Sequence, residues 1–384
     1  MEDWQHGGFG LYIHWPFCAS KCPYCDFNSH VAAHIDQEDW ARAYLSEIDR
    51  IAEETEGRVL NTVFFGGGTP SLMDPALVAQ VLERVGKSWR LANDLEITLE
   101  ANPGSVEAGR FRAYAETGVN RVSMGIQALN DTDLHRLGRL HSVAEARAAF
   151  DIARDAFARV SFDLIYARQF QTPQQWEAEL QTALGMAVDH LSLYQLTIEP
   201  GTAFGARAAK HGLKGLPNDE IAADMYLITQ EICAAHGMPG YEISNHAREG
   251  AASRHNLIYW RGGDYAGIGP GAHGRLTLGN KRYATETPRA PDAWLRQVFE
   301  EENGETPRCE LPQEEQALEY LMMGLRLSEG IDLQRYQELA GQLLNDARLR
   351  DLQDDGFVEL EGSRLKATTK GRPVLNALLR SLVD

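Results

Sequence analysis

Six short runs of apolar, β-forming residues recur within the first 200 residues, separated by longer segments with the apolar period of amphipathic helices. Strands that alternate with helices favour a parallel sheet with right-handed crossovers. We therefore expect an α/β fold whose sheet closes into a partial (β/α)6 barrel. The expected strands are residues 11–14, 62–65, 95–99, 121–124, 160–163 and 190–194. The expected helices are residues 40–54, 76–89, 106–117, 143–156 and 173–187.

Two further regions follow this first domain, which we assign to residues 1–200. Residues 201–306 are rich in glycine and lack a regular pattern, so we expect an irregular extension that completes the site. In residues 307–384, helices at 314–327 and 343–353 precede a hairpin of residues 357–360 and 364–367. This order resembles a winged helix, a module that usually binds DNA. A lid or docking role is favoured instead, because four acidic residues lie beside the hairpin: Asp354, Asp355, Glu359 and Glu361.

Polar and glycine residues follow the expected strands at or near the point where each one ends. In an α/β barrel the carboxyl ends of the strands form one face, and the active site lies there. Ordinary turns would explain the glycines and prolines, but not the polar side chains at matching positions. We therefore expect one site built from Gly66–Pro70, Glu100–Pro103, Gly125–Gln127, Asp163 and Tyr194–Gln195.

Composition excludes several classes of protein. The 384-residue chain carries a net charge of −18, which disfavours binding to nucleic acid. Its N-terminus lacks the basic and apolar segments of a signal peptide, and no apolar run is long enough to span a bilayer. Five cysteines in so long a chain indicate a reducing compartment, not a disulfide framework. We expect a cytoplasmic protein without a transmembrane segment.

Three cysteines, Cys18, Cys22 and Cys25, form the pattern C-x3-C-x2-C. The pair Cys22 and Cys25 alone would suit glutaredoxin-like thiol–disulfide exchange. Structural zinc would need a fourth ligand, for which His14 and His30 are candidates. Inert buried cysteines would not explain three in eight residues. Three thiolates that hold a [4Fe–4S] cluster use all three cysteines and leave one iron open for a ligand, so we favour this interpretation.

This cysteine pattern, with an aromatic residue before its last cysteine, resembles the radical S-adenosylmethionine (SAM) superfamily. In that family the open iron chelates the methionine part of SAM, and an electron from the cluster cleaves SAM to a 5′-deoxyadenosyl radical. The resemblance implies that Arg139 pairs with the carboxylate of SAM, although a surface ion pair is an equal alternative. The SAM-binding residues it implies are Tyr12, Tyr24, Gly67, Gly68, Thr69, Glu100, Gln127, Arg139 and Asp163.

Four further motifs, at residues 12–18, 66–70, 255–260 and 267–274, resemble the oxygen-independent coproporphyrinogen III oxidase group along nearly the whole chain. The true oxidases carry a cysteine where this chain has Phe27, whereas the heme chaperones of the group lack it. The chaperones also carry an H-N-x-x-Y-W motif associated with heme. Here that motif is formed by His255, Asn256, Tyr259 and Trp260.

The resemblance implies that His255 belongs to a heme site, and neutral imidazole is a common axial ligand of heme iron. Asn256 is expected to orient a neighbour, and Tyr259 and Trp260 to offer flat apolar surface. The alternative ligands are Cys233, Cys309, His246 and His273, of which Cys233 suits the apolar face of a helix at residues 220–235.

The implied function is that of a heme chaperone that binds a [4Fe–4S] cluster, SAM and heme. It would pass heme to a recipient hemoprotein such as a membrane respiratory enzyme, without coproporphyrinogen oxidase activity. Oxidative decarboxylation of coproporphyrinogen III is the first alternative, and thiol–disulfide exchange is the second. A cluster-dependent homodimer and a peripheral position at the membrane are further expectations. One departure from the family is Gln169–Phe170, which replaces a usual Pro-Gly pair beside the SAM site.

Overall fold

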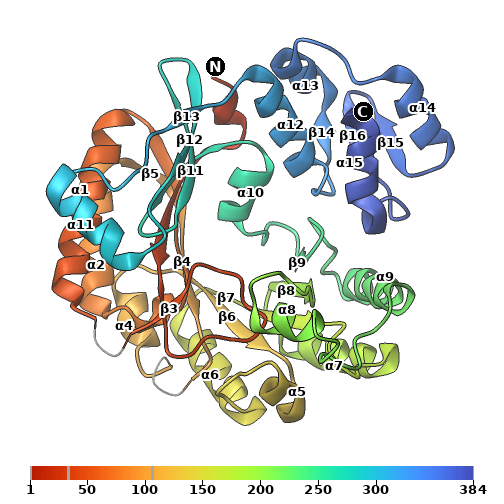
Figure 1. Cartoon of the computed structure of the whole chain (residues 1–384), viewed down its shortest axis with the longest axis horizontal. Helices are drawn as coiled ribbons and strands as arrows, with labels where there is room; N and C mark the ends of the chain where they lie inside the picture. Colours follow the sequence, from red (N-terminus) through yellow and green to blue (C-terminus); the bar gives the residue numbers. More distant parts are fainter. Residues whose placement is uncertain (1, 33–34, 105–107, 384) are drawn as a thin grey trace.

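A single curved sheet organises the computed structural model, which describes residues 2–32, 35–104 and 108–383 (Figure 1). Within these residues the sheet has eleven strands in the order β13–β12–β11–β10–β1–β4–β5–β6–β7–β8–β9. The parallel strands are β10 (Asp264–Ile268), β1 (Phe9–Trp15), β4 (Val59–Gly67), β5 (Arg90–Ala101), β6 (Arg121–Gln127), β7 (Arg159–Tyr166) and β8 (His190–Gln195). The antiparallel strands at the two edges are β13 (Cys309–Glu310), β12 (Lys281–Glu286), β11 (His273–Leu278) and β9 (Asn245–Ala247).

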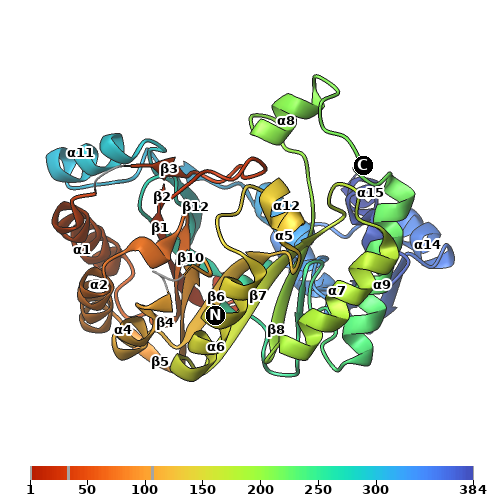
Figure 2. The same ribbon diagram turned by 90° about the horizontal axis from the view of Figure 1, so that it is seen from below.

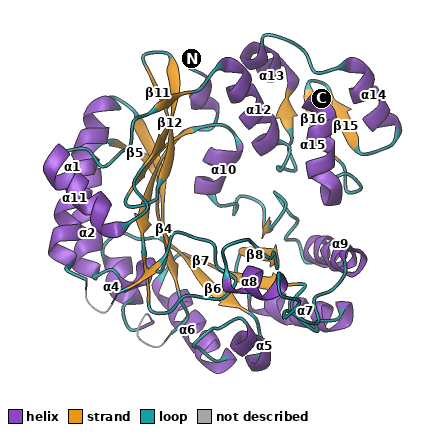
Figure 3. Cartoon of the chain, in the orientation of Figure 1, coloured by secondary structure: helices purple, strands orange, loops and turns teal. Residues whose placement is uncertain are grey.

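Crossover helices cover the convex side of this sheet (Figure 3). At most strand-to-helix turns, the residue before the helix has a side chain that accepts hydrogen bonds from the first helical N–H groups, as Asp36, Asn130 and Ser142 do. The helices are α1 (Gln37–Glu54), α2 (Pro75–Ser88), α4 (Phe111–Glu116), α5 (Asp131–Arg136), α6 (Val143–Ala156) and α7 (Pro173–Met186). The parallel α/β fold is therefore confirmed. The predicted helix at 106–117 is observed only from Phe111, and its residues 106 and 107 lie outside the described part of the chain.

Alternation along the strands separates the hydrophobic core from a polar interior. In β5, Ile97 and Leu99 are buried in the core shared with the helices, whereas Thr98 and Glu100 face the inside of the curve. Successive side chains of a strand point to opposite faces, so a strand that reads apolar–polar–apolar lines both compartments at once. The inside of the curve is therefore polar, which suits a binding site better than a filled core.

The extension at 201–306 is not irregular, and that prediction is wrong. It contains α8 (Ala203–Ala208), α9 (Asp219–Ala235), α10 (Arg254–Trp260) and α11 (Pro291–Glu301), together with β9 to β12. Strand β10 pairs in parallel with β1 and so adds a seventh strand to the barrel sheet. Glycine hid this strand from the sequence pattern. At Gly267 a Cβ atom would lie 2.1 Å from the carbonyl oxygen of His273, so the close return of β11 requires glycine there.

Helix α10 lies on the concave side of the sheet, between the sheet and the C-terminal module (Figure 1). Seen from below, α8 stands at the same end of the molecule as the loop between β1 and α1 (Figure 2). This placement is fixed by the N–H of Phe204, which donates to the carbonyl of Pro23 at 2.8 Å. The extension therefore reaches both the inside of the barrel and the rim that carries the cysteines.

A second hydrophobic core lies in the C-terminal module, with Leu321, Leu325 and Leu365 fully buried. The predicted hairpin is present as β15 (Val358–Glu361) and β16 (Arg364–Ala367), and β14 (Ile331–Asp332) joins it. The predicted helices are α12 (Gln313–Gly324) and α14 (Asp346–Asp354), to which the structure adds α13 (Leu333–Ala340) and α15 (Leu375–Val383). Among the described helices, none combines the length and apolar character needed to cross a membrane.

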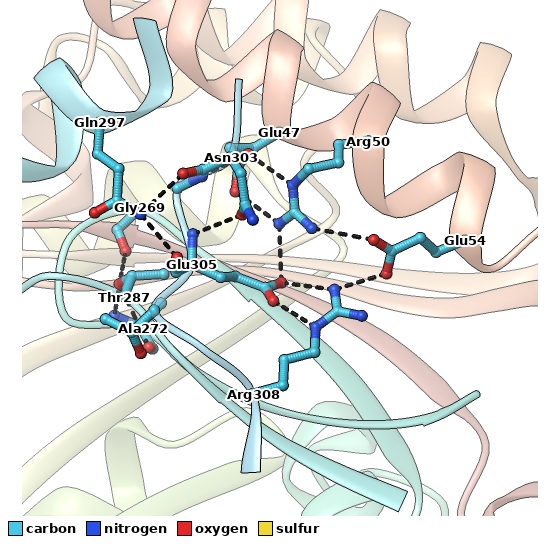
Figure 4. Close-up of polar contacts among 12 residues, drawn as sticks. Glu47, Arg50, Glu54, Gly269, Ala272, Thr287, Gln297, Asn303, Glu305 and Arg308 are labelled. Atoms are coloured by element: carbon cyan, nitrogen blue, oxygen red, sulfur yellow. Dashed lines mark hydrogen bonds and ion pairs between the residues drawn. The ribbon is translucent and has the colours of Figure 1, made fainter. Parts of the chain in front are cut away.

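An ion-pair network fastens the end of the extension to α1 (Figure 4). The Glu305 carboxylate, only 2% exposed, accepts from Arg50 at 2.9 Å and from Arg308 at 2.6 Å. Buried Glu47 also binds Arg50 and accepts from the N–H of Gly304 at 3.0 Å. Burial alone would raise the pKa of Glu305, but Arg308 and Arg50 outweigh it and hold that pKa below its ordinary value. The network therefore depends on the ionised form of Glu305.

We expect Glu305→Gln to lower the free energy of unfolding by about 3 kcal/mol at neutral pH, because two arginines lose a buried partner. Because the pKa of Glu305 is lower in the folded protein than in the unfolded chain, where it is about 4.3, its ionisation stabilises the fold above that pH. This stabilisation is lost as the pH falls through the folded pKa. The difference from the wild type should therefore narrow below about pH 4. Urea denaturation measures this, with Glu300→Gln on the exposed face of α11 as control. Equal losses in both variants would contradict the account.

Candidate functional site

The three cysteines lie on the loop that follows β1, at the carboxyl end of the parallel strands. Cys18 ends the short strand β2 (Phe17–Cys18), which pairs with β3 (His30–Val31), and Cys22 and Cys25 form a turn closed by a 3.2 Å backbone hydrogen bond. All three are free and half-buried, and they line one cavity of about 140 Å³. The loop therefore presents three thiols to a common space.

Side chains from the turn after β4 and from the loop after α5 contact two of these sulfurs. The Thr69 hydroxyl donates to Cys18 Sγ at 3.4 Å, and the Arg139 guanidinium donates to Cys22 Sγ at 3.4 Å. Arg139 also donates to the carbonyl of Gly125 at 2.8 Å, so it joins the cysteine loop to β6. Burial is the largest influence on Cys18 and Cys25, and it raises the pKa of both thiols. Binding of iron there would release protons.

Asn28 anchors the cysteine loop to the extension. Its side-chain amide donates to the carbonyls of Pro270 and Arg289, both at 2.9 Å, and its own carbonyl is hydrogen-bonded to His14 Nε2 at 2.9 Å. At Gly271 a Cβ atom would lie 2.4 Å from the Asn28 side chain, so this contact needs glycine. The sequence analysis missed Asn28, since nothing in its local pattern signals a partner 242 residues away.

The first cavity gathers most of the residues predicted to bind SAM. Glu100 and Gln127 come from the ends of β5 and β6, Arg139 comes from the loop after α5, and Gln127 has a left-handed backbone with a φ of 73°. Asp163 lies within β7, not at its end as predicted, because the strand continues to Tyr166. Tyr12 lines a neighbouring cavity instead. The predicted residues that line the first cavity are Cys18, Cys22, Cys25, Tyr24, Gly67, Gly68, Thr69, Glu100, Gln127, Arg139 and Asp163.

Two carboxyl groups give this cavity its electrostatic character. Burial and the charge of Asp163 raise the pKa of Glu100 to about 8, although the N–H of Gly67 donates to it at 3.2 Å. Burial likewise raises the pKa of Asp163 to about 6, against the opposing effect of Ser192 and Arg121. Glu100 is therefore largely protonated at neutral pH, and a cationic or hydroxyl-bearing ligand would favour its ionised, hydrogen-bond-accepting form.

The residues present fit an iron–sulfur cluster with SAM. Arg139 Nε is buried and has no hydrogen-bond partner among the described residues, so the cavity contains a donor suited to a carboxylate. Three thiols with one open side suit a cluster with one non-cysteine position. Among the described residues, no three His, Cys, Asp or Glu side chains are placed to hold a single metal ion, so the geometry gives no support to zinc.

A second cavity, of about 460 Å³, lies beside the first, opens to the surface and is lined by aromatic and charged residues. The two cavities share Phe27, Gly67 and Glu100 in their walls. Phe27 is 65% exposed and stands at this shared wall, where the sequence resemblance places a cysteine in the true oxidases. The remaining walls are formed by Tyr12, His14, Asp26, Asn28, Tyr259, Trp260, Tyr265, Gly271, His273, Arg289 and Met323.

The H-N-x-x-Y-W motif forms α10, and its members have different surroundings. Tyr259 and Trp260 line the second cavity, whereas His255 is 1% exposed and does not. Ring nitrogens of His255 are hydrogen-bonded to the hydroxyls of Thr62 at 2.6 Å and Tyr259 at 2.5 Å. Burial, with a smaller contribution from Arg121, lowers the pKa of His255 to about 3. The ring is neutral, but no nitrogen faces open space.

The other predicted candidates are scattered. Asn256 is half-buried, and its N–H donates to Ser253. Cys233 is buried on α9, as its helical pattern predicted, and Cys309 is exposed on β13. His246 is buried in β9 against Gln230.

The departure at Gln169–Phe170 preserves the backbone shape that the family's glycine would provide. Phe170 has a φ of 64°, in the left-handed region that glycine favours, and its N–H donates to Gly215 at 2.6 Å. Its ring is 58% exposed and stacks on Arg136. Neither residue lines the first cavity, so the substitution leaves the walls of that cavity unchanged.

Comparisons with known proteins agree with this geometry. The model of the Radical SAM superfamily matches residues 12–183, and that of the HemN C-terminal domain matches residues 311–374. The chain is 39% identical to the mitochondrial radical S-adenosyl methionine domain-containing protein 1 of Bos taurus, over 97% of this chain and 87% of that protein. It is 36% identical to the heme chaperone HemW of Haemophilus influenzae and to that of Escherichia coli, in each case over 96% of both chains.

Among solved structures, coproporphyrinogen III oxidase (HemN) of Escherichia coli superposes with a TM-score of 0.81. The alignment covers 98% of this chain and 92% of that one, at 22% identity. At this level of identity the likeness shows the fold alone.

We expect anaerobic reconstitution with iron and sulfide to give a brown protein with about four irons per chain. Cys18→Ala, Cys22→Ala and Cys25→Ala should each lose most of this iron, because each removes one cluster thiolate. Cys309→Ser, on an exposed edge strand, is the matched control and should retain it. Iron and acid-labile sulfide analysis provides the readout. A colourless protein with one tightly bound zinc would refute the assignment.

A second prediction concerns the protonation of Glu100. Because its folded pKa of about 8 exceeds the unfolded value, the folded protein retains a proton that the unfolded chain releases, and stability falls as the pH rises through this window. Glu100→Gln removes that dependence. Between about pH 5 and pH 9, the free energy of unfolding of the variant should rise relative to that of the wild type by on the order of 2 kcal/mol. This value is reduced to allow for water in the cavity. Denaturation at both pH values measures this. Glu53→Gln, exposed on α1, should show no such gain, and a pH-independent difference for Glu100→Gln would argue against the raised pKa.

Proposed function

Because the chain belongs to the radical SAM superfamily, in the family that includes the heme chaperones HemW, we propose that it binds heme and delivers it to recipient hemoproteins. The single observation that carries the proposal is the aromatic cavity beside the cysteine site, about 460 Å³ in volume. Ligand cavities of small-molecule sites measure about 300–1,000 Å³ and are mainly apolar with a few polar groups. A porphyrin is a flat ligand of this class.

The walls of the second cavity suit the chemistry of heme. Tyr12, Tyr259 and Trp260 offer flat rings on which a porphyrin can stack. Arg289 is exposed at the same cavity, and its guanidinium makes no ion pair among the described residues, so it can bind a propionate. We assign the H-N-x-x-Y-W motif to this heme site, with His255 supporting the Tyr259 hydroxyl at 2.5 Å.

The cysteine site holds the cofactors of the same proposal. Cys18, Cys22 and Cys25 would hold the [4Fe–4S] cluster, which supplies an electron source and one open iron. The surrounding residues would orient SAM on that iron, with Arg139 as the partner of its carboxylate and Glu100 beside Gly67 as a hydrogen-bond acceptor. Since the two cavities share a wall, occupancy of one bears on the other. We propose a membrane respiratory enzyme as the recipient and a cytoplasmic site of action.

Hemin titration tests the proposal. The wild type should develop a Soret band that saturates at one hemin per chain, and Trp260→Ala should weaken binding on the order of tenfold, because a stacking surface is lost. Phe299→Ala, which removes an exposed ring on α11, is the control and should bind as the wild type does. Loaded protein should then transfer its heme to an apo-hemoprotein.

Two outcomes would contradict the chaperone proposal. The first is absence of saturable hemin binding by the wild type. The second is efficient conversion of coproporphyrinogen III when the cluster-loaded protein is given SAM and a reductant, since that would favour the oxidase alternative.

A further inference from the structure

Direct ligation of iron by His255 conflicts with its surroundings. Both ring nitrogens are hydrogen-bonded, and the ring packs against Phe64 at 4.9 Å and Tyr12 at 6.3 Å between centroids. An axial ligand must offer a nitrogen lone pair to the iron. To do so, His255 would have to give up a buried hydrogen bond and move away from Phe64 and Tyr12. Thr62 or Tyr259 would then lose its partner.

His273 stands in a different position. It is the first residue of β11, its side chain is 58% exposed, and it lines the second cavity together with Tyr259 and Trp260. Among the described residues, no hydrogen bond engages the ring of His273. Glu286 approaches it across the β11–β12 pair, with its Oε1 3.6 Å from His273 Nδ1. Nε2 is therefore available to a ligand in the cavity.

The position of the Glu286 carboxylate beside His273 is the second observation. Histidines that bind metals commonly direct their other ring nitrogen to a carboxylate, which fixes the ring and makes the free nitrogen a better ligand. Glu286 lies on the Nδ1 side of His273 at 3.6 Å, just beyond hydrogen-bond range, so a small side-chain movement would bring it to Nδ1 and leave Nε2 for iron. His246 and Cys233 lack this arrangement, because both are buried away from the cavity.

The backbone that carries His273 is held firmly. The N–H of Ala272 donates to the Thr287 hydroxyl at 2.9 Å, and that hydroxyl donates to the carbonyl of Gly269 at 2.6 Å (Figure 4). The N–H of Gly271 donates to the carbonyl of Pro288 at 3.0 Å, one residue before the exposed Arg289. The loop before β11 and the segment after β12 are thus joined, and they present a ligand and a propionate-binding cation to the same cavity.

We propose that His273, oriented by Glu286, supplies the axial nitrogen ligand to the iron of heme bound in the cavity lined by Tyr259, Trp260 and Arg289. The inference rests on the proposed heme-binding function and adds the residue that holds the iron. In this arrangement His255 acts as a positioning residue: it fixes Tyr259 through their hydrogen bond and does not touch the iron.

Spectroscopy of the hemin complex tests the assignment. His273→Gly should lose the signature of histidine coordination in electron paramagnetic resonance and resonance Raman spectra, and its Kd for hemin should rise on the order of tenfold. Free imidazole should restore the spectrum, because the deleted side chain leaves a cavity open to solvent. Glu286→Gln should shift the iron–histidine stretching frequency while coordination persists. His135→Ala, exposed on α5, is the matched control.

His255→Ala separates the two histidines. If the inference holds, this variant keeps the coordination signature even where its affinity falls, and imidazole does not change it. An unchanged spectrum in His273→Gly overturns the inference while the heme-binding function stands. Failure of the wild type to bind hemin overturns both. Circular dichroism and thermal unfolding establish that each variant is folded, and metal-free protoporphyrin, followed by quenching of tryptophan fluorescence, reports binding that does not depend on a ligand to iron.

Discussion

The site depends on a close backbone contact that only glycine allows. The Gly66–Pro70 turn at the end of β4 lies against the start of the cysteine loop, and a Cβ atom at Gly68 would sit 2.7 Å from the carbonyl oxygen of Phe17. Across this contact the N–H of Thr69 donates to Phe17 at 2.8 Å, and the Thr69 hydroxyl reaches Cys18. The sequence analysis named Gly67 and Gly68 only as residues that bind SAM. The structure adds that they hold the loop that carries the thiols.

From this contact the two cavities follow. The cysteine loop is bounded on one side by the end of β5, which carries Glu100, and by the loop after α5, which carries Arg139, and on the other by the turn that carries His273. Asn28 joins the loop to that turn, so the two cavities are connected by few and short contacts. The shared wall at Phe27, Gly67 and Glu100 gives a physical reason why a cluster, SAM and heme can belong to one function.

The sequence predicted the barrel well because the apolar residues of its strands and of its helices recur with different periods. Ser161 and Asp163 at the inward positions did not obscure the strand at residues 160–163, because its outward residues, Val160 and Phe162, are strongly apolar. Strand β10 was missed because Gly267, required for close packing with β11, carries no apolar signal in so short a strand. The cysteines and the strand-end residues were found from spacing and order. Asn28, Arg289 and the availability of His273 were not, since each depends on contacts between segments far apart in the chain.

The central claim is that heme occupies the aromatic cavity beside the cysteine site. Anomalous iron scattering from crystals of the hemin-loaded, cluster-loaded protein tests it most directly. The account predicts two separate iron positions: a cluster bound by Cys18, Cys22 and Cys25, and a single iron in the cavity lined by Tyr259, Trp260 and His273. A porphyrin iron located outside that cavity, or anomalous density at the cluster alone, would contradict it.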